Sequence, residues 1–174
     1  YSQKGTVKAV ISTDIWGDNT PDHMQAEIRF CSADESRGTV SGNLSQIFTL
    51  DPSEGSYSKN VTPESVSLSP VEGYEFSHWT DGKGNIIVNP FMNQTVFGGK
   101  TYTYTAHWKP LTNLIYTVQY LDMSGAQIRT TKEAVGQTFG HKIKSADEIV
   151  KIEGYVFDHA DKSEIVIGVT PADN

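Results

Sequence analysis

The stretch Glu72-Gly73-Tyr74-Glu75-Phe76-Ser77-His78 decides the fold, because it returns later in the chain as Glu153-Gly154-Tyr155-Val156-Phe157-Asp158-His159. The two copies share Glu, Gly, Tyr, Phe and His at the same spacing and lie 81 positions apart, 153 minus 72. An internal echo of this kind is typical of modular arrays, in which each unit packs a small core of its own. The repeat therefore predicts two tandem units rather than one domain built around a single site.

Within each copy, the glycine and the aromatic residues have separate structural tasks. Gly73 and Gly154 suit a backbone with positive φ at the end of a short helix. Tyr74 and Phe76, like their counterparts in the second copy, alternate along the strand that follows and so face one side of a sheet. Each buried ring contributes about 1.5–3 kcal/mol. We therefore interpret the signature as a helix-to-strand joint whose aromatic residues anchor a thin core.

Much of the remaining chain alternates apolar and polar residues, which is typical of half-buried strands. The clearest runs are 26–31, 101–108 and 116–121. Turn residues separate the strands: Met123-Ser124-Gly125-Ala126 predicts a hairpin, and Asp81-Gly82-Lys83-Gly84-Asn85 predicts a second turn. The sequence thus predicts a mainly β chain.

Helix signals are few and short. Ser145-Ala146-Asp147-Glu148 has the Ser-x-x-Glu spacing of a capping box and predicts a helix of one or two turns that stops at Gly154. In the first unit, Thr62 and Pro63 suit the cap and first position of a similar helix. If both helices form, the fold class becomes α+β, with at most one short helix in each unit.

The boundary between the units is predicted near residues 109–113, because Pro110 ends a strand and restricts the residue before it to an extended conformation. The predicted organisation is an N-terminal strand and polar loop at 1–22, a first domain at 23–110 and a second domain at 111–174. The segment 1–22 belongs either to the first domain or to a unit that precedes it.

The two units differ after the signature. In the first, Tyr102 opens an alternating closing strand 23 positions after Trp79. In the second, Ala160 replaces the tryptophan and lies 14 positions before Asn174. The second unit is therefore expected to lack its last strand. An edge of its sheet would then be open to pairing with a neighbouring chain or with the N-terminal strand of another copy, although a monomer is expected otherwise.

Composition excludes several classes of partner. The chain has 14 basic and 21 acidic residues, a net charge of −7, and no long basic run, so neither nucleic acid nor an anionic membrane surface is an expected partner. No stretch approaches the roughly 18 apolar residues of a membrane span. Tyr1 opens no signal peptide, so targeting segments are expected to have been removed or to lie in a longer parent chain.

Cys31 is the single cysteine, which excludes an internal disulfide and a thiolate cluster for metal. We expect it to be a small buried residue on a strand.

No catalytic constellation is present in the sequence, so we expect neither an enzyme nor a cofactor. The histidines are scattered, and His78 and His107 are the pair for which a zinc site is conceivable, with ordinary surface histidines as the alternative. Asp14, Asp18 and Asp22 are candidate calcium ligands, although they lack the regular spacing of a calcium loop and a solvated loop is the alternative.

Three tryptophans are candidates for a ligand-binding surface. Exposed aromatic faces stack on carbohydrate rings, and ordinary packing in the core is the alternative. The candidates are Trp16, Trp79 and Trp108.

Both units resemble repeats of Gram-positive bacterial surface proteins. The second resembles the mucin-binding-protein repeat over about residues 114–174, through Tyr116-Thr117-Val118-Gln119-Tyr120-Leu121-Asp122, Ser124-Gly125, Ile128, Gly136-Gln137-Thr138 and Ile152-Glu153-Gly154-Tyr155. The first is similar to the internalin-type B repeat, with Gly-Tyr-x-Phe-x-x-Trp at 73–79 and a closing strand at 102–109, although His78 stands where that pattern often has Gly. The resemblance implies two tandem small β-grasp-like (ubiquitin-like) domains, each with a mixed sheet.

The resemblance also implies a function and a location. It implies a non-catalytic repeat module of a cell-surface protein, extracellular and anchored to the cell wall through parts of the parent protein outside this sequence. The module would serve as a stalk that contacts host mucin or glycoprotein glycans, with neighbouring repeats as partners. A pure spacer without ligand and an accessory binding domain of a secreted enzyme are the alternatives. In this setting a Lys–Asn amide cross-link would need a buried, desolvated lysine.

Overall fold

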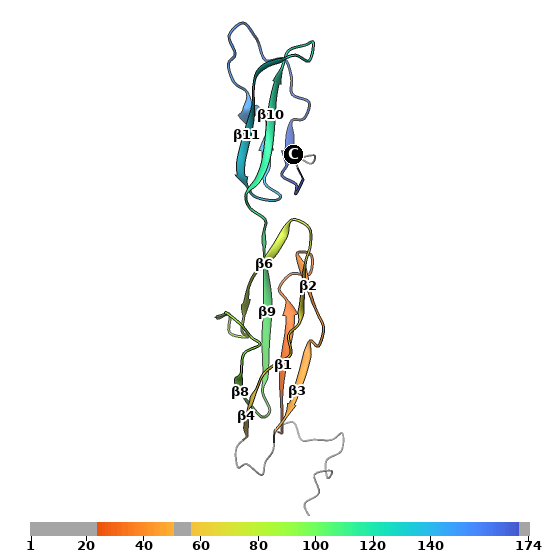
Figure 1. Ribbon diagram of the computed structural model, residues 1–174, viewed down its shortest axis with the longest axis vertical. Helices are drawn as coiled ribbons and strands as arrows, with labels where there is room; N and C mark the ends of the chain where they lie inside the picture. The colour runs from red at the N-terminus through yellow and green to blue at the C-terminus, as the bar shows by residue number, and fades with distance from the viewer. Residues whose placement is uncertain (1–23, 51–56, 171–174) are drawn as a thin grey trace, which may run out of the picture.

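The structure, a computed structural model, describes residues 24–50 and 57–170. Its architecture is mainly β, as predicted, and its strands pair in two sets that lie end to end (Figure 1). We call residues 24–110 unit 1 and residues 111–170 unit 2. The predicted runs 26–31, 101–108 and 116–121 all lie in strands.

The strands of unit 1 are β1 (Gln25–Ser32), β2 (Gly38–Ser41), β3 (Ser45–Thr49), β4 (Ser58–Val61), β5 (Ser67–Pro70), β6 (Tyr74–Thr80), β7 (Ile86–Ile87), β8 (Gln94–Phe97) and β9 (Thr101–Pro110). Unit 2 contains β10 (Leu114–Leu121), β11 (Gln127–Gln137), β12 (Lys142–Lys144), the 3₁₀ turn η3 (Ser145–Glu148) and β13 (Glu164–Val166).

Unit 1 is built around a mixed five-stranded sheet in the order β3-β1-β9-β6-β7. β1 and β9 are parallel at its centre, with Phe30 opposite Tyr104, and the other pairs are antiparallel. Two further antiparallel ribbons, β2-β5 and β4-β8, complete the unit. Because the first and last strands of the unit are central neighbours, the sheet is complete only once β9 is in place.

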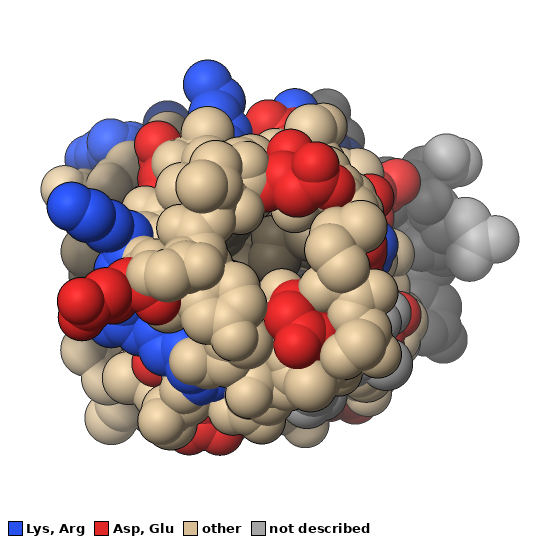
Figure 2. Space-filling model, turned by 90° about the horizontal axis from the view of Figure 1, so that it is seen from above, with Lys and Arg blue, Asp and Glu red and all other residues tan. Residues whose placement is uncertain are grey.

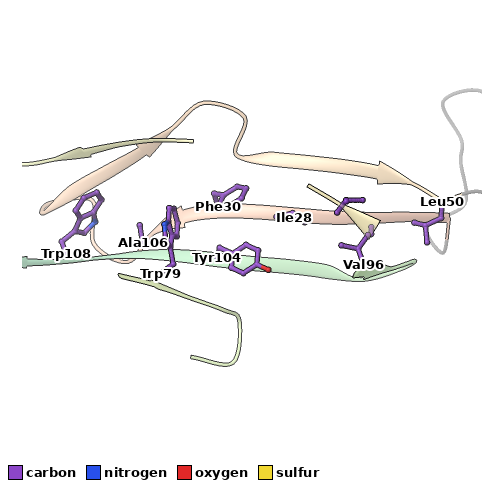
Figure 3. Packing of buried hydrophobic residues seen from close by; sticks show 10 residues of the cluster. Ile28, Phe30, Leu50, Trp79, Val96, Tyr104, Ala106 and Trp108 are labelled. Carbon is purple, nitrogen blue, oxygen red and sulfur yellow. The ribbon is translucent and has the colours of Figure 1, made fainter. Parts of the chain in front are cut away.

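The core of unit 1 forms around Phe30 of β1 (Figure 3). Its ring centroid lies 5.7 Å from that of Tyr104 and 5.8 Å from that of Trp79. Phe91, in the segment between β7 and β8, stacks on it at 5.2 Å. The buried cluster comprises Ala26, Ile28, Phe30, Leu50, Val61, Trp79, Val96, Tyr104, Ala106 and Trp108.

Trp108 closes the end of the core nearest unit 2. Its indole lies directly on Gly38, where an added Cβ would be 2.5 Å from ring atoms. The indole Nε1 donates a hydrogen bond of 2.8 Å to the hydroxyl of Ser32, which in turn donates to the carbonyl of Gly38 at 2.6 Å. The turn between β1 and β2 is therefore held against the end of β9.

A bulge in β6 places two aromatic residues of the signature on the same side of the sheet. The pairing with β9 shifts between Phe76 and His78, so Ser77 is an extra residue in β6. Without the bulge, residues three apart would face opposite sides. With it, Phe76 and Trp79 both pack on the core, with ring centroids 5.7 Å apart.

The helix expected at Thr62 is wrong, because none forms at residues 62–66. The buried side chain of Gln46 holds this segment instead. Its Oε1 accepts from the backbone N–H of Glu64 at 2.7 Å, and its Nε2 donates to the Glu64 carbonyl at 2.9 Å. Both backbone groups of Glu64 thus have partners outside a helix. Gly73 has the predicted positive φ of 87°, but it follows β5 in a turn rather than a helix.

The capping box at Ser145 also does not form. The hydroxyl of Ser145 donates to the carbonyl of Ser163 at 3.1 Å, and the segment makes a single 3₁₀ turn without a side-chain cap. Gly154 has the predicted positive φ, 81°, without a helix directly before it. The signature is therefore a turn that leads into the segment after it, and the interpretation as a helix-to-strand joint is wrong.

Cys31 lies on a strand, as expected, but it is exposed rather than buried. The core face of β1 carries Ala26, Ile28 and Phe30, so the alternation directs Cys31 to the opposite face. There its Sγ lies 3.4 Å from the hydroxyl of Thr105 on β9.

Unit 2 is a long hairpin, β10-β11, beside a short pair, β12-β13. The predicted hairpin turn is confirmed. The Asp122 carboxylate accepts from the backbone N–H of Ser124 at 2.8 Å and of Ala126 at 2.9 Å. The predicted turn between β6 and β7 is confirmed in the same way, because Asp81 accepts from the backbone N–H of Asn85.

Glu148 of η3 ties the two parts of unit 2 together. Its carboxylate accepts from Lys132 of β11 and from the hydroxyl of Tyr116 on β10, both at 2.6 Å. The Tyr120 hydroxyl reaches the carbonyl of Glu148 at 3.3 Å. The hydrogen bonds from Lys132 and Tyr116 lower the pKa of Glu148.

Replacing Glu148 by glutamine is expected to remove a pH-dependent part of the stability of unit 2. Because the folded pKa of Glu148 is lowered, its contribution is present above the ordinary carboxyl pKa of about 4.3 and is lost as pH falls through the folded value. Urea unfolding followed by circular dichroism should show Glu148→Gln less stable at neutral pH, with the difference narrowing below about pH 4. Glu133→Gln, on the exposed face of β11, is the control and should track the parent chain at every pH.

Candidate functional site: the joint and an open groove

Of the three tryptophans proposed as ligand-binding residues, two lie in the core of unit 1 and one lies outside the described residues. Trp79 is 4% exposed and Trp108 is 8% exposed, and both rings pack among aromatic neighbours. Neither therefore offers a face for stacking on a sugar ring. Trp16 lies outside the described residues, as do Asp14, Asp18 and Asp22.

His78 and His107 are brought together, as the sequence pattern suggested. Their rings stack with centroids 4.7 Å apart and an interplanar angle of 5°. The Nδ1 of His78 is 2.9 Å from the Ser77 hydroxyl, and the Nε2 of His107 is 2.9 Å from the Thr80 hydroxyl. Over residues 24–50 and 57–170, no group of three or more His, Cys, Asp or Glu side chains is arranged to hold a metal ion. The pair is thus explained by hydrogen bonding and stacking across β6 and β9.

Every lysine of the described ranges is exposed. An amide cross-link needs a lysine that burial has deprived of its proton. The described lysines do not meet that condition, so they do not support the Lys–Asn amide cross-link considered from the sequence.

Unit 1 and unit 2 meet at a joint formed by Gly73, Tyr74, Leu111 and Phe139. The backbone N–H of Leu111 donates to the Gly73 carbonyl at 2.8 Å, and the N–H of Phe139 donates to the Leu111 carbonyl at 2.9 Å. The ring of Phe139 meets that of Tyr74 edge-on, with centroids 5.5 Å apart at 70°. It lies so close to buried Gly73 that an added Cβ would be 2.3 Å from its ring atoms.

At this joint, the first copy of the signature contacts unit 2 as well as packing within unit 1. Tyr74 was expected to anchor the core of its own unit beside Phe76, but its ring partner is Phe139 of unit 2. Sequence reasoning missed Phe139, which stands in the loop sequence Thr138-Phe139-Gly140. The signal that could have identified it is a single aromatic residue between turn residues, where a large apolar side chain needs a packing partner.

Unit 2 contains an open groove of about 900 Å³. Its lining includes Val118 and Tyr120 of β10, Ile143 of β12 and Ile165 of β13. Its lining also includes the segment 155–161, which contains most of the second copy of the signature. Figure 2, which views the end of the molecule formed by unit 2, shows the hollow with acidic residues at its border.

The second copy of the signature is not a strand and is poorly covered. Tyr155 is 51% exposed, Val156 is 94% exposed and Phe157 is 53% exposed. In unit 1 the equivalent Phe76 packs against the core, because β9 lies beside β6. Apolar side chains left open in this way mark a surface for binding another segment.

The groove is acidic. Its lining carries Asp122, Glu148, Asp158 and Asp161 against the single lysine Lys162. His159 is also in the lining, and its hydrogen bond of 2.6 Å to Asp158 raises its pKa. A basic or neutral segment therefore fits this groove better than an acidic one.

Comparisons of the chain with protein-family models, with curated proteins and with solved structures found no match. No helix in the described part of the chain has the length and apolar character needed to span a membrane.

Proposed function

We propose that this chain is a non-catalytic repeat module of a bacterial cell-surface protein and acts there as a stalk. The observation that carries the proposal is the joint, where backbone hydrogen bonds through Leu111 and the packing of Phe139 on Gly73 hold the two units in line. The connection is short, since only residues 111–113 separate β9 from β10. A spacer needs this kind of stiffness, because a floppy connection would let the units collapse on one another.

The finer fold belongs to the same proposal. The central parallel pairing of the first and last strands of unit 1, in a mixed sheet, supports a β-grasp-like domain without its helix. Unit 2 carries the same signature, and the turn after its first strand matches the turn after β1, which supports a second domain of this type. The sequence resemblance to surface repeats supports an extracellular, wall-anchored parent protein in which neighbouring repeats are the partners.

Adhesion to mucin is a second role, which a stalk can have or lack. The glycan-stacking hypothesis rested on exposed tyrosines and tryptophans, and the two tryptophan candidates that the structure describes are buried. This favours a spacer over an adhesin for the described part of the chain. Binding of the purified chain to immobilised mucin measures the adhesive role directly, and signal above that of a mucin-free surface would support the adhesin.

A measurement of the distance between the units tests the stalk. Cys31 is the sole cysteine and is exposed, so it takes a spin label in unit 1, and Thr130→Cys provides the second on the exposed β11. We expect a single narrow distance distribution by double electron–electron resonance, because the joint fixes the units. Small-angle scattering should give a radius of gyration well above the roughly 16 Å of a compact globule of this length.

Insertion of a flexible Gly/Ser linker after Thr112 is the control. It should broaden the distance distribution while leaving the circular dichroism spectrum unchanged. A parent chain as broad as this variant would contradict the stalk.

A further inference from the structure

The groove of unit 2 lies where unit 1 has its central strand. The first strand of each unit, β1 or β10, ends in a matching turn, because Asp34 accepts from the N–H and hydroxyl of Ser36 as Asp122 does from those of Ser124. Aligning these aspartates places Phe30 of β1 at Val118 of β10. β1 has β9 as its second neighbour in unit 1, whereas β10 pairs with β11 alone among the described strands.

The occupant of the groove must therefore have the pattern of β9. In that strand Tyr104, Ala106 and Trp108 are buried, and the residues between them are half-buried. The strand runs parallel to β1, with Ala106 opposite Ser32. A strand that fills unit 2 in the same way would run parallel to β10, between it and the segment 155–160.

Residues 5–12, Gly-Thr-Val-Lys-Ala-Val-Ile-Ser, carry this pattern. Thr6 and Ala9 match Thr103 and Ala106 at the same spacing, an offset of 97. The positions of the three buried residues of β9 then hold Val7, Ala9 and Ile11, all apolar. Since side chains alternate along a strand, these three would face the groove together.

Charge favours the same segment. The first acidic residue of the chain is Asp14, so residues 1–12 carry Lys4 and Lys8 with no carboxylate. Glu148 is already paired with Lys132, so the groove offers Asp122, Asp158 and Asp161 against Lys162. Opposite charge at the border of an apolar groove raises the rate of encounter and sets which segment binds.

Residues 5–12 cannot reach the groove of their own molecule. From Ser12 to Met24 it spans at most about 43 Å when fully extended. The N–H of Gly99 donates to the Gln25 carbonyl, so the start of β1 lies beside the start of β9. From there the path along β9 and on to Tyr120 of β10, in the same direction (Figure 1), is about 33 Å plus 23 Å. Residues 5–12 that fill this groove therefore come from another copy of the chain.

We infer that the groove of unit 2 is an acceptor for a β-strand, and that residues 5–12 of a second copy of this chain are its occupant. Transferring the register of β1 and β9 places Val7 opposite Val118 and Ala9 opposite Tyr120. The contact joins the front of one molecule to the back of the next, so it does not close on itself and each copy can both donate and accept. The inference does not depend on the stalk role, because it concerns the sheet of unit 2 alone.

Sedimentation velocity of the whole chain over a wide concentration range tests the inference. We expect head-to-tail multimers that grow with concentration. A synthetic peptide of residues 3–14 should compete for the groove and return the chain to monomers. A dye-labelled version of the peptide should bind the chain in fluorescence anisotropy.

Adjacent substitutions in the peptide and in the chain provide the matched control. Ala9→Asp places a charge on the face toward the groove, and Val10→Asp places the same charge on the opposite face. We expect Ala9→Asp to weaken binding and assembly about tenfold or more, because a buried unpaired carboxylate is costly, and Val10→Asp to weaken them far less. A chain that stays monomeric and does not bind the peptide, or equal effects of the two substitutions, would overturn the inference.

Discussion

Replacing Trp79 by alanine is expected to destabilise unit 1 by about 3–5 kcal/mol, the largest effect of any single substitution considered for this chain. The indole is 4% exposed and lies against Phe30, Phe76 and Phe91. Small domains are stable by about 5–15 kcal/mol in total, so a loss of about 3–5 kcal/mol is roughly a fifth or more of the stability of the unit. Urea unfolding monitored by circular dichroism measures the change.

A second substitution at position 79 shows how much of the lost stability comes from losing the aromatic ring itself. Trp79→Phe keeps an aromatic ring on Phe30 and is expected to recover at least half of the lost stability. Unit 2 has its own hydrogen-bonded strands, so the unfolding of Trp79→Ala should show a separate transition for it. Equal stability of Trp79→Ala and the parent chain would show that the aromatic cluster is not the core of unit 1.

Replacing Gly73 by alanine is expected to loosen the joint between the units. The backbone φ at Gly73 is 87°, which costs an alanine about 1–2 kcal/mol. An alanine Cβ there would also lie 2.3 Å from the ring of Phe139, so the ring must leave its edge-on contact with Tyr74. Spin labels on Cys31 and Thr130→Cys should then give a broad distance distribution in place of a narrow one.

Gly154 is the matched control for this prediction. It is the equivalent glycine of the second signature, with a φ of 81°, and nothing lies within 4 Å of its added Cβ. Gly154→Ala should therefore lose the stability that an alanine at positive φ costs, without broadening the distribution of distances between the two spin labels. In a Phe139→Ala background, the cost of Gly73→Ala should fall to that of Gly154→Ala, since the clash is gone. An identical broadening by both glycine substitutions would refute the assignment of the joint.

Local patterns predicted local structure well. Alternation placed the strands at 26–31, 101–108 and 116–121, because side chains of a strand alternate whatever lies around it. The predicted turns formed after Asp81 and Asp122, because an aspartate carboxylate accepts hydrogen bonds from the backbone a few residues further along the chain. The candidate site was not predicted: neither the joint through Phe139 nor the groove of unit 2 follows from a local pattern.

The errors arose where a distant side chain replaced a local partner. The helix expected at Thr62 does not form, because the side chain of Gln46 binds the backbone of Glu64. The cap expected at Ser145 does not form, because the Ser145 hydroxyl donates to the carbonyl of Ser163. The exposure of Cys31 depended on which face of β1 meets the core. None of these partners is near in sequence, so capping and turn rules could not find them.

The sequence by itself determined the mainly β character, the turns, the doubled signature with its positive-φ glycines and the asymmetry between the two units. These follow from local sterics, backbone bonding and residue counts. Only the tertiary structure decided that a bulge at Ser77 brings Phe76 and Trp79 to one core, that Tyr74 packs on Phe139, and that the second signature lies open beside a groove. The physical reason is that these features depend on which strand lies beside which, and the pairing of β1 with β9 joins residues more than 70 positions apart.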